Sequence, residues 1–190
     1  MASFVVVLDT DVLYPFELRD TLLLAAEDGL FQARWTDDIL AELRSNLVKN
    51  GVTSERQATH LIEQMALNFP EADVPGYRQL IVAMTNDPKD RHVAAAAVAG
   101  HAQVIVTRNL RHFRSSALAP FGIEAQSPDV FLTHLFHLFP VQMMQVLERQ
   151  VAQRERPPIE IDQVLDILAR QVPQFVQLAR QRRQISPAAR

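Results

Sequence analysis

The sequence contains no cysteine and only five glycines among its 190 residues. The lack of cysteine excludes a disulfide framework, a thiolate metal site and a cysteine nucleophile. The glycines are scattered, so no glycine-rich phosphate loop is present. No apolar run approaches the roughly 18–20 residues that a membrane-spanning helix needs, and the first residues do not resemble a secretory signal. We therefore expect a cytoplasmic protein that has no membrane partner.

A marked excess of either charge is also missing, because 19 Lys and Arg residues face 22 Asp and Glu residues. The net charge of −3 does not by itself indicate a nucleic-acid-binding protein. Two local groups of arginine are more informative, since arginine forms bidentate contacts to phosphate. The group around His112 supplies our candidate RNA contacts, Arg108, Arg111 and Arg114. The group after Asp166 fits a solvated face equally well; it consists of Arg170, Arg180, Arg182, Arg183 and Arg190.

Short apolar runs alternate with helical patterns in the first two thirds of the chain. Residues 4–8 and 104–106 predict strands that are buried on both faces, with weaker strands at 31–35 and 122–125. This alternation predicts an α/β fold with a parallel sheet. Beyond residue 126 only helices are predicted. We therefore expect an α/β domain over residues 1–126 and an all-α extension over residues 127–190.

The first candidate site is the pair Asp9 and Asp11, directly after the strand at residues 4–8. Ligands of open parallel sheets bind beyond the carboxyl ends of the strands, where Asp9 is expected. Aspartate is also a common helix N-cap, and the pair alone does not decide between these roles.

Two further candidates lie on predicted helices. Glu42 follows the N-cap candidate Thr36 and falls close to an apolar stripe, where a carboxylate needs a partner or the edge of the helix. Taken alone, it fits an exposed glutamate better. Asp87 can cap the helix that begins at Pro88, whereas Asp90 lies in the first turn of an alanine-rich helix, where the helix dipole favours anions.

The last candidates follow the strand at residues 104–106. Thr107 and Asn109 are hydrogen-bonding groups suited to orienting a carboxylate or a water, although both are also ordinary cap residues. We expect His112 to be a surface histidine. Together, Asp9, Asp90 and Glu42 offer the oxygen ligands that a hard cation such as Mg²⁺ or Mn²⁺ prefers. A nucleophilic serine elbow and a zinc-binding H-E-x-x-H motif are missing, so metal-assisted hydrolysis is the chemistry on offer.

Four segments in this order resemble the PIN-domain family: LDTDV at 8–12, ILAEL at 39–43, DPKDRHVAAA at 87–96 and TRNLRHF at 107–113. The resemblance covers about residues 4–126 and implies a three-layer α/β/α fold with a short, mainly parallel sheet. It implies that Asp9, Glu42 and Asp90 are the catalytic acids that hold Mg²⁺, with Thr107 supporting them. Asn109 stands where the family often has a fourth acid, which leaves one metal or two open. Asp11 and Asp87 are then supporting residues.

Within that family the chain is similar to VapC-type toxin ribonucleases, and its helical tail to the extension of a longer subgroup. The similarity implies an Mg²⁺-dependent endoribonuclease that inhibits translation or growth, with an antitoxin protein as partner and tRNA or mRNA as substrate. Whether the chain forms a homodimer is left open.

Two alternatives are weighed against this. A haloacid-dehalogenase-type phosphatase would use Asp9 as nucleophile, but its strand-ending threonine should precede the later acidic motif, and Thr107 follows Asp87 and Asp90. An inactive PIN fold that binds RNA or protein is the second alternative, because Asn109 supplies no charge.

Overall fold

The computed structural model describes residues 4–154 and 157–185. Residues 1–3, where a signal segment was considered, and Arg190 of the second arginine group lie outside this range. A parallel sheet of four strands occupies the first of two compact units, which contains the described residues of Met1–Pro15 together with Phe31–Ser127. The second unit contains Phe16–Leu30 and the described residues of Pro128–Arg190.

The strand order in the sheet is β2-β1-β3-β4, and all three pairings are parallel. The strands are β1 (Val5–Leu8), β2 (Gln32–Arg34), β3 (Val104–Val106) and β4 (Glu124–Gln126). Because β1 lies in the middle, between β2 and β3, its apolar residues are buried almost completely. In a parallel sheet the carboxyl ends of the strands share one edge, so Asp9 and Thr107 follow neighbouring strands at the same edge.

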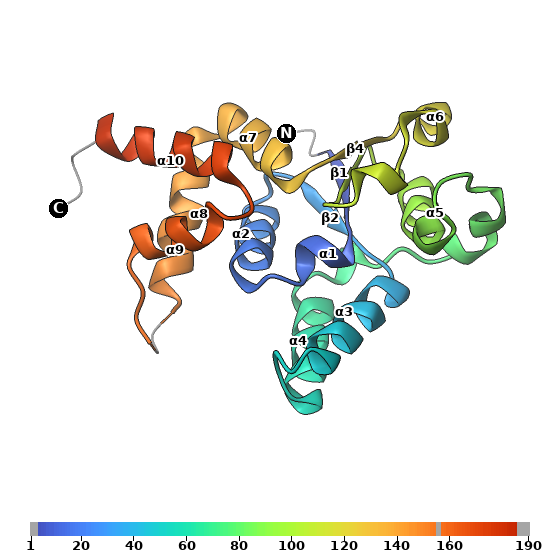
Figure 1. The fold of residues 1–190 in the computed structure, drawn as a ribbon, viewed down its shortest axis with the longest axis horizontal. Helices are drawn as coiled ribbons and strands as arrows, with labels where there is room; N and C mark the ends of the chain where they lie inside the picture. Colours follow the sequence, from blue (N-terminus) through green and yellow to red (C-terminus); the bar gives the residue numbers. More distant parts are fainter. Residues whose placement is uncertain (1–3, 155–156, 186–190) are drawn as a thin grey trace. The chain divides into compact units, whose positions relative to one another are not determined.

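Helices and 3₁₀ turns connect the strands of this unit (Figure 1). The α-helices are α1 (Thr10–Leu13), α3 (Asp37–Lys49), α4 (Glu55–Asn68), α5 (Arg91–Ala99) and α6 (Ser115–Leu118). The 3₁₀ turns are η1 (Pro70–Ala72), η2 (Tyr77–Ala83), η3 (Pro88–Asp90), η4 (Leu110–His112) and η5 (Ala119–Phe121). Thr36 caps α3 as predicted, and Ser54 forms a capping box with Gln57 at the start of α4. In α5 the buried stretch from Val93 to Ala97 allows close packing against η2.

The regular elements of the second unit, in its described residues, are α-helices. Its helices are α2 (Phe16–Glu27), α7 (Pro128–Leu138), α8 (Pro140–Ala152), α9 (Ile161–Leu168) and α10 (Pro173–Ile185). Phe175 of α10 is fully buried and meets Phe136 of α7 edge to face, with 6.0 Å between the ring centroids. The predicted α/β fold with a parallel sheet and a helical C-terminal region is therefore confirmed.

Within the described residues no single helix is long and apolar enough to cross a membrane. Taken together, α7 and α8 meet that test of length and composition, but the pair is bent by 118°.

Candidate active site

Asp9 lies between β1 and α1, with only 4% of its surface exposed. Its Oδ1 accepts the backbone N–H of Thr10 at 2.7 Å, which makes Asp9 the N-cap of α1. Its Oδ2 accepts the hydroxyl of Thr107 at 2.7 Å. The helix-capping role and the strand-end position weighed from the sequence are therefore both found in this one residue.

Asp11 ties the segment after β3 to the end of β1. Its two carboxylate oxygens accept the backbone N–H of Arg108 at 3.1 and 2.9 Å. The Thr107 hydroxyl is 3.3 Å from Asp11 and also accepts the backbone N–H of Asn109 at 3.0 Å. Thr107 thus orients two neighbouring carboxylates and is itself held by the turn that follows it.

Glu42 reaches the same region from α3 although half of its side chain is exposed. The Thr10 hydroxyl donates to Glu42 Oε2 at 2.9 Å and lies 3.3 Å from the carbonyl oxygen of Ile39. His92 Nε2 lies 3.9 Å from Glu42 Oε2. Sequence reasoning missed Thr10 and His92. The polar residue between Asp9 and Asp11 was the available signal for Thr10.

Asp90 is at the N-terminus of α5 but makes no capping hydrogen bond with its side chain. Instead, its Oδ2 lies 2.6 Å from Nδ1 of His112. The predicted surface histidine is half-buried, because 23% of the His112 side chain is exposed, and its partner is a candidate catalytic acid. Asp87 has the capping role considered from the sequence, since its Oδ1 accepts the N–H of Lys89.

The gathering of carboxylates has an electrostatic cost. Burial, followed by repulsion from Asp11, raises the pKa of Asp9 to about 7, and Asp90 adds to the effect. Burial and the charge of Asp90 also raise the pKa of Asp11. A bound cation would offset both causes by supplying opposite charge. The donor set consists of carboxylate oxygens at the edge of a sheet and therefore fits a hard divalent cation.

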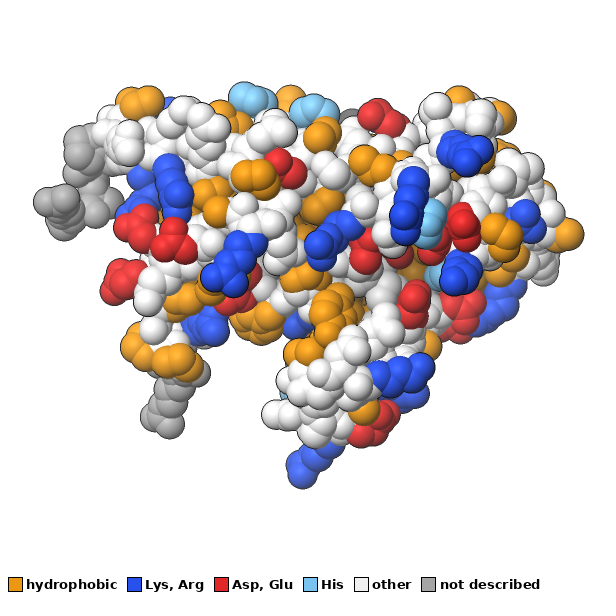
Figure 2. Space-filling view, viewed as in Figure 1, with side chains coloured by type: hydrophobic (Ala, Val, Ile, Leu, Met, Phe, Trp, Pro, Cys, Tyr) orange, Lys and Arg blue, Asp and Glu red, His pale blue; other side chains and the backbone are white. Residues whose placement is uncertain are grey.

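The surface around this cluster is mixed in charge. Figure 2 shows acidic side chains next to Lys, Arg and His side chains in the region of α1, α3 and α5. Among the arginines proposed to contact RNA, Arg108 is exposed and interacts with Asp11, while Arg111 donates from Nε to His112 at 3.1 Å. Arg114 is exposed at the start of α6.

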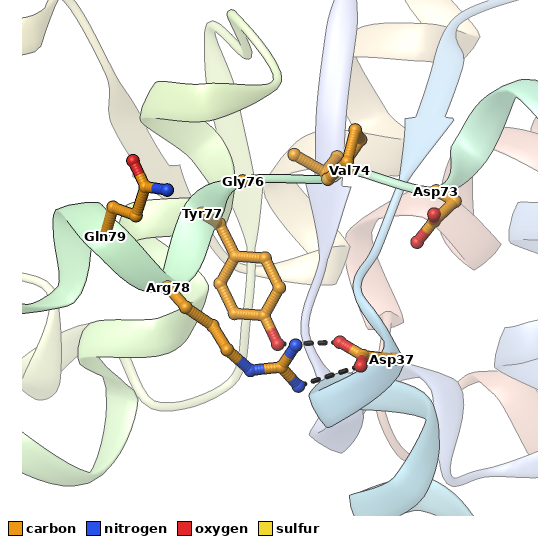
Figure 3. Close-up of a pocket in the computed structure, with 8 residues that line it drawn as sticks. Asp37, Asp73, Val74, Gly76, Tyr77, Arg78 and Gln79 are labelled. Atoms are coloured by element: carbon orange, nitrogen blue, oxygen red, sulfur yellow. Dashed lines mark hydrogen bonds and ion pairs between the residues drawn. The ribbon is translucent and has the colours of Figure 1, made fainter.

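The N-terminus of α3 is braced by a second polar cluster (Figure 3). Arg78 pairs with Asp37 and Asp38 at 2.8 Å each, and the Tyr77 hydroxyl hydrogen-bonds to both carboxylates. These bonds lower the pKa of Asp37, with the hydrogen bond from Tyr77 as the largest cause. A cavity of about 390 Å³ lies beside the cluster and is also lined by Asp73. The bonds from Tyr77 and Arg78 hold the start of α3, the helix that carries Glu42, in place.

Two family models match separate parts of the chain. The PIN domain family model matches residues 5–111, which is more than half of the chain, and the chain therefore belongs to the PIN-domain family. The VapC50 C-terminal domain model matches residues 128–181.

A curated relative is the "Putative ribonuclease VapC50" of Mycobacterium tuberculosis (strain ATCC 25618 / H37Rv), 47% identical over 105 residues. That alignment covers 55% of this chain and 62% of the relative, so the chain spans less than two thirds of the relative's length. No solved structure matches.

Proposed function

We propose that this protein is an Mg²⁺-dependent endoribonuclease, the toxin of a toxin–antitoxin pair that inhibits translation or growth in the cytoplasm. The observation that carries the proposal is the burial of Asp9 at the end of β1, where the charges of Asp11 and Asp90 act on it and where the hydroxyl of the next residue, Thr10, donates to Glu42. Membership of the PIN-domain family supports it, as does the name of the M. tuberculosis relative, a putative ribonuclease. Its partners would be an antitoxin protein and an RNA substrate such as tRNA or mRNA.

Asp9, Glu42 and Asp90 are the residues that would hold the cation, which is Mg²⁺ with Mn²⁺ as a substitute. When bound, such a cation lowers the pKa of a water and stabilises charge on the attacked phosphate. The chain's other residues keep the acids in place. Thr107 orients Asp9, Asp11 fastens the turn after β3, and the Thr10 hydroxyl holds Glu42.

The basic residues beside the acids would contact the RNA backbone. Arg108 and Arg114 are exposed, and guanidinium groups bind phosphate oxygens well. Asn109 donates its backbone N–H to the Thr107 hydroxyl and adds no charge to the site. We therefore propose that Asp9, Glu42 and Asp90 hold a single cation. We also propose that residues 1–126 form the nuclease domain and residues 127–190 a helical extension that contributes to substrate or antitoxin binding.

The test is cleavage of a structured RNA by the purified chain with and without Mg²⁺, beside an Asp90→Asn variant. Cleavage that needs the cation and is lost in the variant would support the proposal. An Asp162→Asn variant is a suitable control, because Asp162 is exposed on α9 and pairs with Arg183. Asp162→Asn should leave cleavage unchanged.

Two outcomes would contradict the nuclease. Equal and negligible cleavage by the chain and by Asp90→Asn, with RNA still bound, would favour a binding module. Turnover of small phosphate esters with the RNA left intact would favour a phosphatase.

A further inference from the structure

His112 fastens the turn after β3 to the turn before α5 through two separate hydrogen bonds. Its Nδ1 lies 2.6 Å from Oδ2 of Asp90. Its backbone carbonyl oxygen accepts the N–H of Asp87 at 3.2 Å. The backbone bond places the imidazole next to Asp90 by fixing where residue 112 lies. The side-chain contact between His112 and Asp90 is therefore supported by a backbone hydrogen bond between the same two turns.

The partners of the imidazole decide where its proton lies. Arg111 Nε is 3.1 Å from His112 Nε2, and a guanidinium group has only donors. Nε2 must therefore accept with its lone pair, which places the ring proton on Nδ1. An ionised Asp90 accepts that proton in its hydrogen bond. Both ring nitrogens thus have defined roles, and Arg111 selects the tautomer that can donate to the carboxylate.

We propose that His112, held in its Nδ1–H tautomer by Arg111, is a positioning residue that orients Asp90 for cation binding. The inference rests on the proposed function only in taking Asp90 as a cation ligand. His112 engages Oδ2, and Asp90 makes no capping bond to its own helix, so the rotation of the carboxylate is set from outside α5. Hydrogen-bonding partners behind a metal ligand commonly change metal affinity or activity by about 10–100-fold when they are removed.

A direct role as a ligand is the competing explanation. Ligand atoms of Asp87, Asp90 and His112 all lie within 4.8 Å of one another, which is close enough for one ion. A ring nitrogen must give up its proton to bind a metal, however, and the bond from Arg111 keeps the proton on Nδ1. The geometry therefore favours positioning, and direct ligation becomes an outcome of the experiment.

The decisive comparison uses two neutral variants of similar shape. In His112→Asn the side-chain amide can place an N–H near the position of Nδ1, whereas His112→Leu has a similar size and no donor. Mn²⁺ affinity is measured by electron paramagnetic resonance, and folding by thermal unfolding. We expect His112→Leu to weaken Mn²⁺ binding about 10–100-fold and His112→Asn to stay within about threefold of the unchanged chain. His60→Leu, on the exposed face of α4, is the control.

The tautomer gives a readout that needs neither metal nor RNA, and its first measurement uses the unchanged chain. Nitrogen-15 NMR of the unchanged chain should show the His112 proton on Nδ1. In Arg111→Ala the proton should redistribute toward Nε2. Observing the Nε2–H tautomer in the unchanged chain would overturn the proposal.

Two metal results would also overturn it. One is equal Mn²⁺ affinity of the Asn and Leu variants. The other is a nitrogen-14 coupling to bound Mn²⁺ that disappears in His112→Asn, which would make His112 a ligand. These measurements do not involve RNA, so an absence of RNA cleavage would count against the nuclease alone.

Discussion

In the unit that holds the sheet, the buried Asp9 lies among other carboxylates, whereas in the helical unit Glu17 and Asp129 each have a donor. Asp9 lies beside Asp11 and within reach of the charge of Asp90. In the helical unit, Glu17 pairs with Arg154 at 2.5 Å. Asp129 accepts the backbone N–H groups of Gln174 and Phe175 at the start of α10.

The difference distinguishes acids that form a candidate catalytic site from acids that stabilise the packing of helices. Gathering like charges in a buried place opposes folding, so such a cluster indicates chemistry rather than stability. Pairing each buried charge with a donor keeps the cost of burial small and fixes how helices pack. Substitutions in the two units should therefore affect different measurements, and four of them, three at acidic residues, test this.

Asp9→Asn should have the largest effect and should separate activity from stability. The amide keeps the size of the carboxylate but loses its charge, so we expect RNA cleavage to fall about 10³-fold, equivalent to about 4 kcal/mol of transition-state stabilisation. The thermal unfolding temperature near neutral pH should stay the same or rise, because a repelled buried charge has been removed. A variant that is both inactive and clearly less stable would mean that Asp9 is mainly a structural residue.

Phe175→Ala should show the reverse pattern in the helical unit. Phe175 is fully buried and packs against Phe136, so its removal should cost about 3–4 kcal/mol of unfolding free energy. Chemical denaturation measures this cost. Cleavage per folded molecule, assayed well below the unfolding midpoint, should change less than about threefold if the acids of the sheet unit carry the chemistry. A loss as large as that of Asp9→Asn would show that the helical unit takes part in the reaction.

Asp129→Ala tests the capping of α10. The change removes the acceptor for the two N–H groups and should lower the free energy of unfolding by about 1–2 kcal/mol. Asp162→Ala is the control, since Asp162 is exposed and its ion pair with Arg183 should contribute about 0.5 kcal/mol or less. Equal losses for the two variants would contradict the capping role.

Asp20 is the exception in the helical unit, and Asp20→Asn tests it. Burial, followed by repulsion from Glu17, raises the pKa of Asp20 from 3.8 to about 6. A raised pKa in the folded chain means a stabilising contribution that is fully present below pH 4 and is lost as the pH rises through 6. Because Asp20 is partly exposed, we expect Asp20→Asn to gain only about 1 kcal/mol at pH 7. Thermal unfolding between pH 4 and 7 should show the two curves separating as the pH rises, and parallel curves would contradict the shift.

The local features of the fold were predictable because their causes lie within a few residues. β-Branched residues identified β1 and β3, and the polar cap Thr36 identified the start of α3. The membership of α2 in the helical unit was not predictable in this way, because its amphipathic pattern requires an apolar partner without specifying which one. The predicted boundary between a nuclease domain over residues 1–126 and a helical extension over residues 127–190 therefore stays a prediction.

In the candidate site, too, some features were predictable from the sequence and others depended on tertiary contacts. Strand ends and residue types indicated Asp9, Asp90 and Thr107, whereas Glu42 taken alone fitted an exposed glutamate better. The PIN-domain resemblance joined the four residues into one set. Their partners depended on contacts across the chain: Thr10 meets Glu42 across 32 positions, and His112 meets Asp90 across 22. A histidine between Arg111 and Phe113 gives no local signal that it faces a carboxylate.

By itself, the sequence determined that this chain is an α/β protein with acids at the end of its first strand and a helical tail. These properties follow from side-chain periodicity and backbone preferences, which act over short distances. Only the tertiary structure decided that Asp9 is buried beside other acids, and that His112 and Arg111 act on Asp90. Burial and hydrogen-bond direction depend on which distant segments pack together, and they decide the charge and orientation of each group.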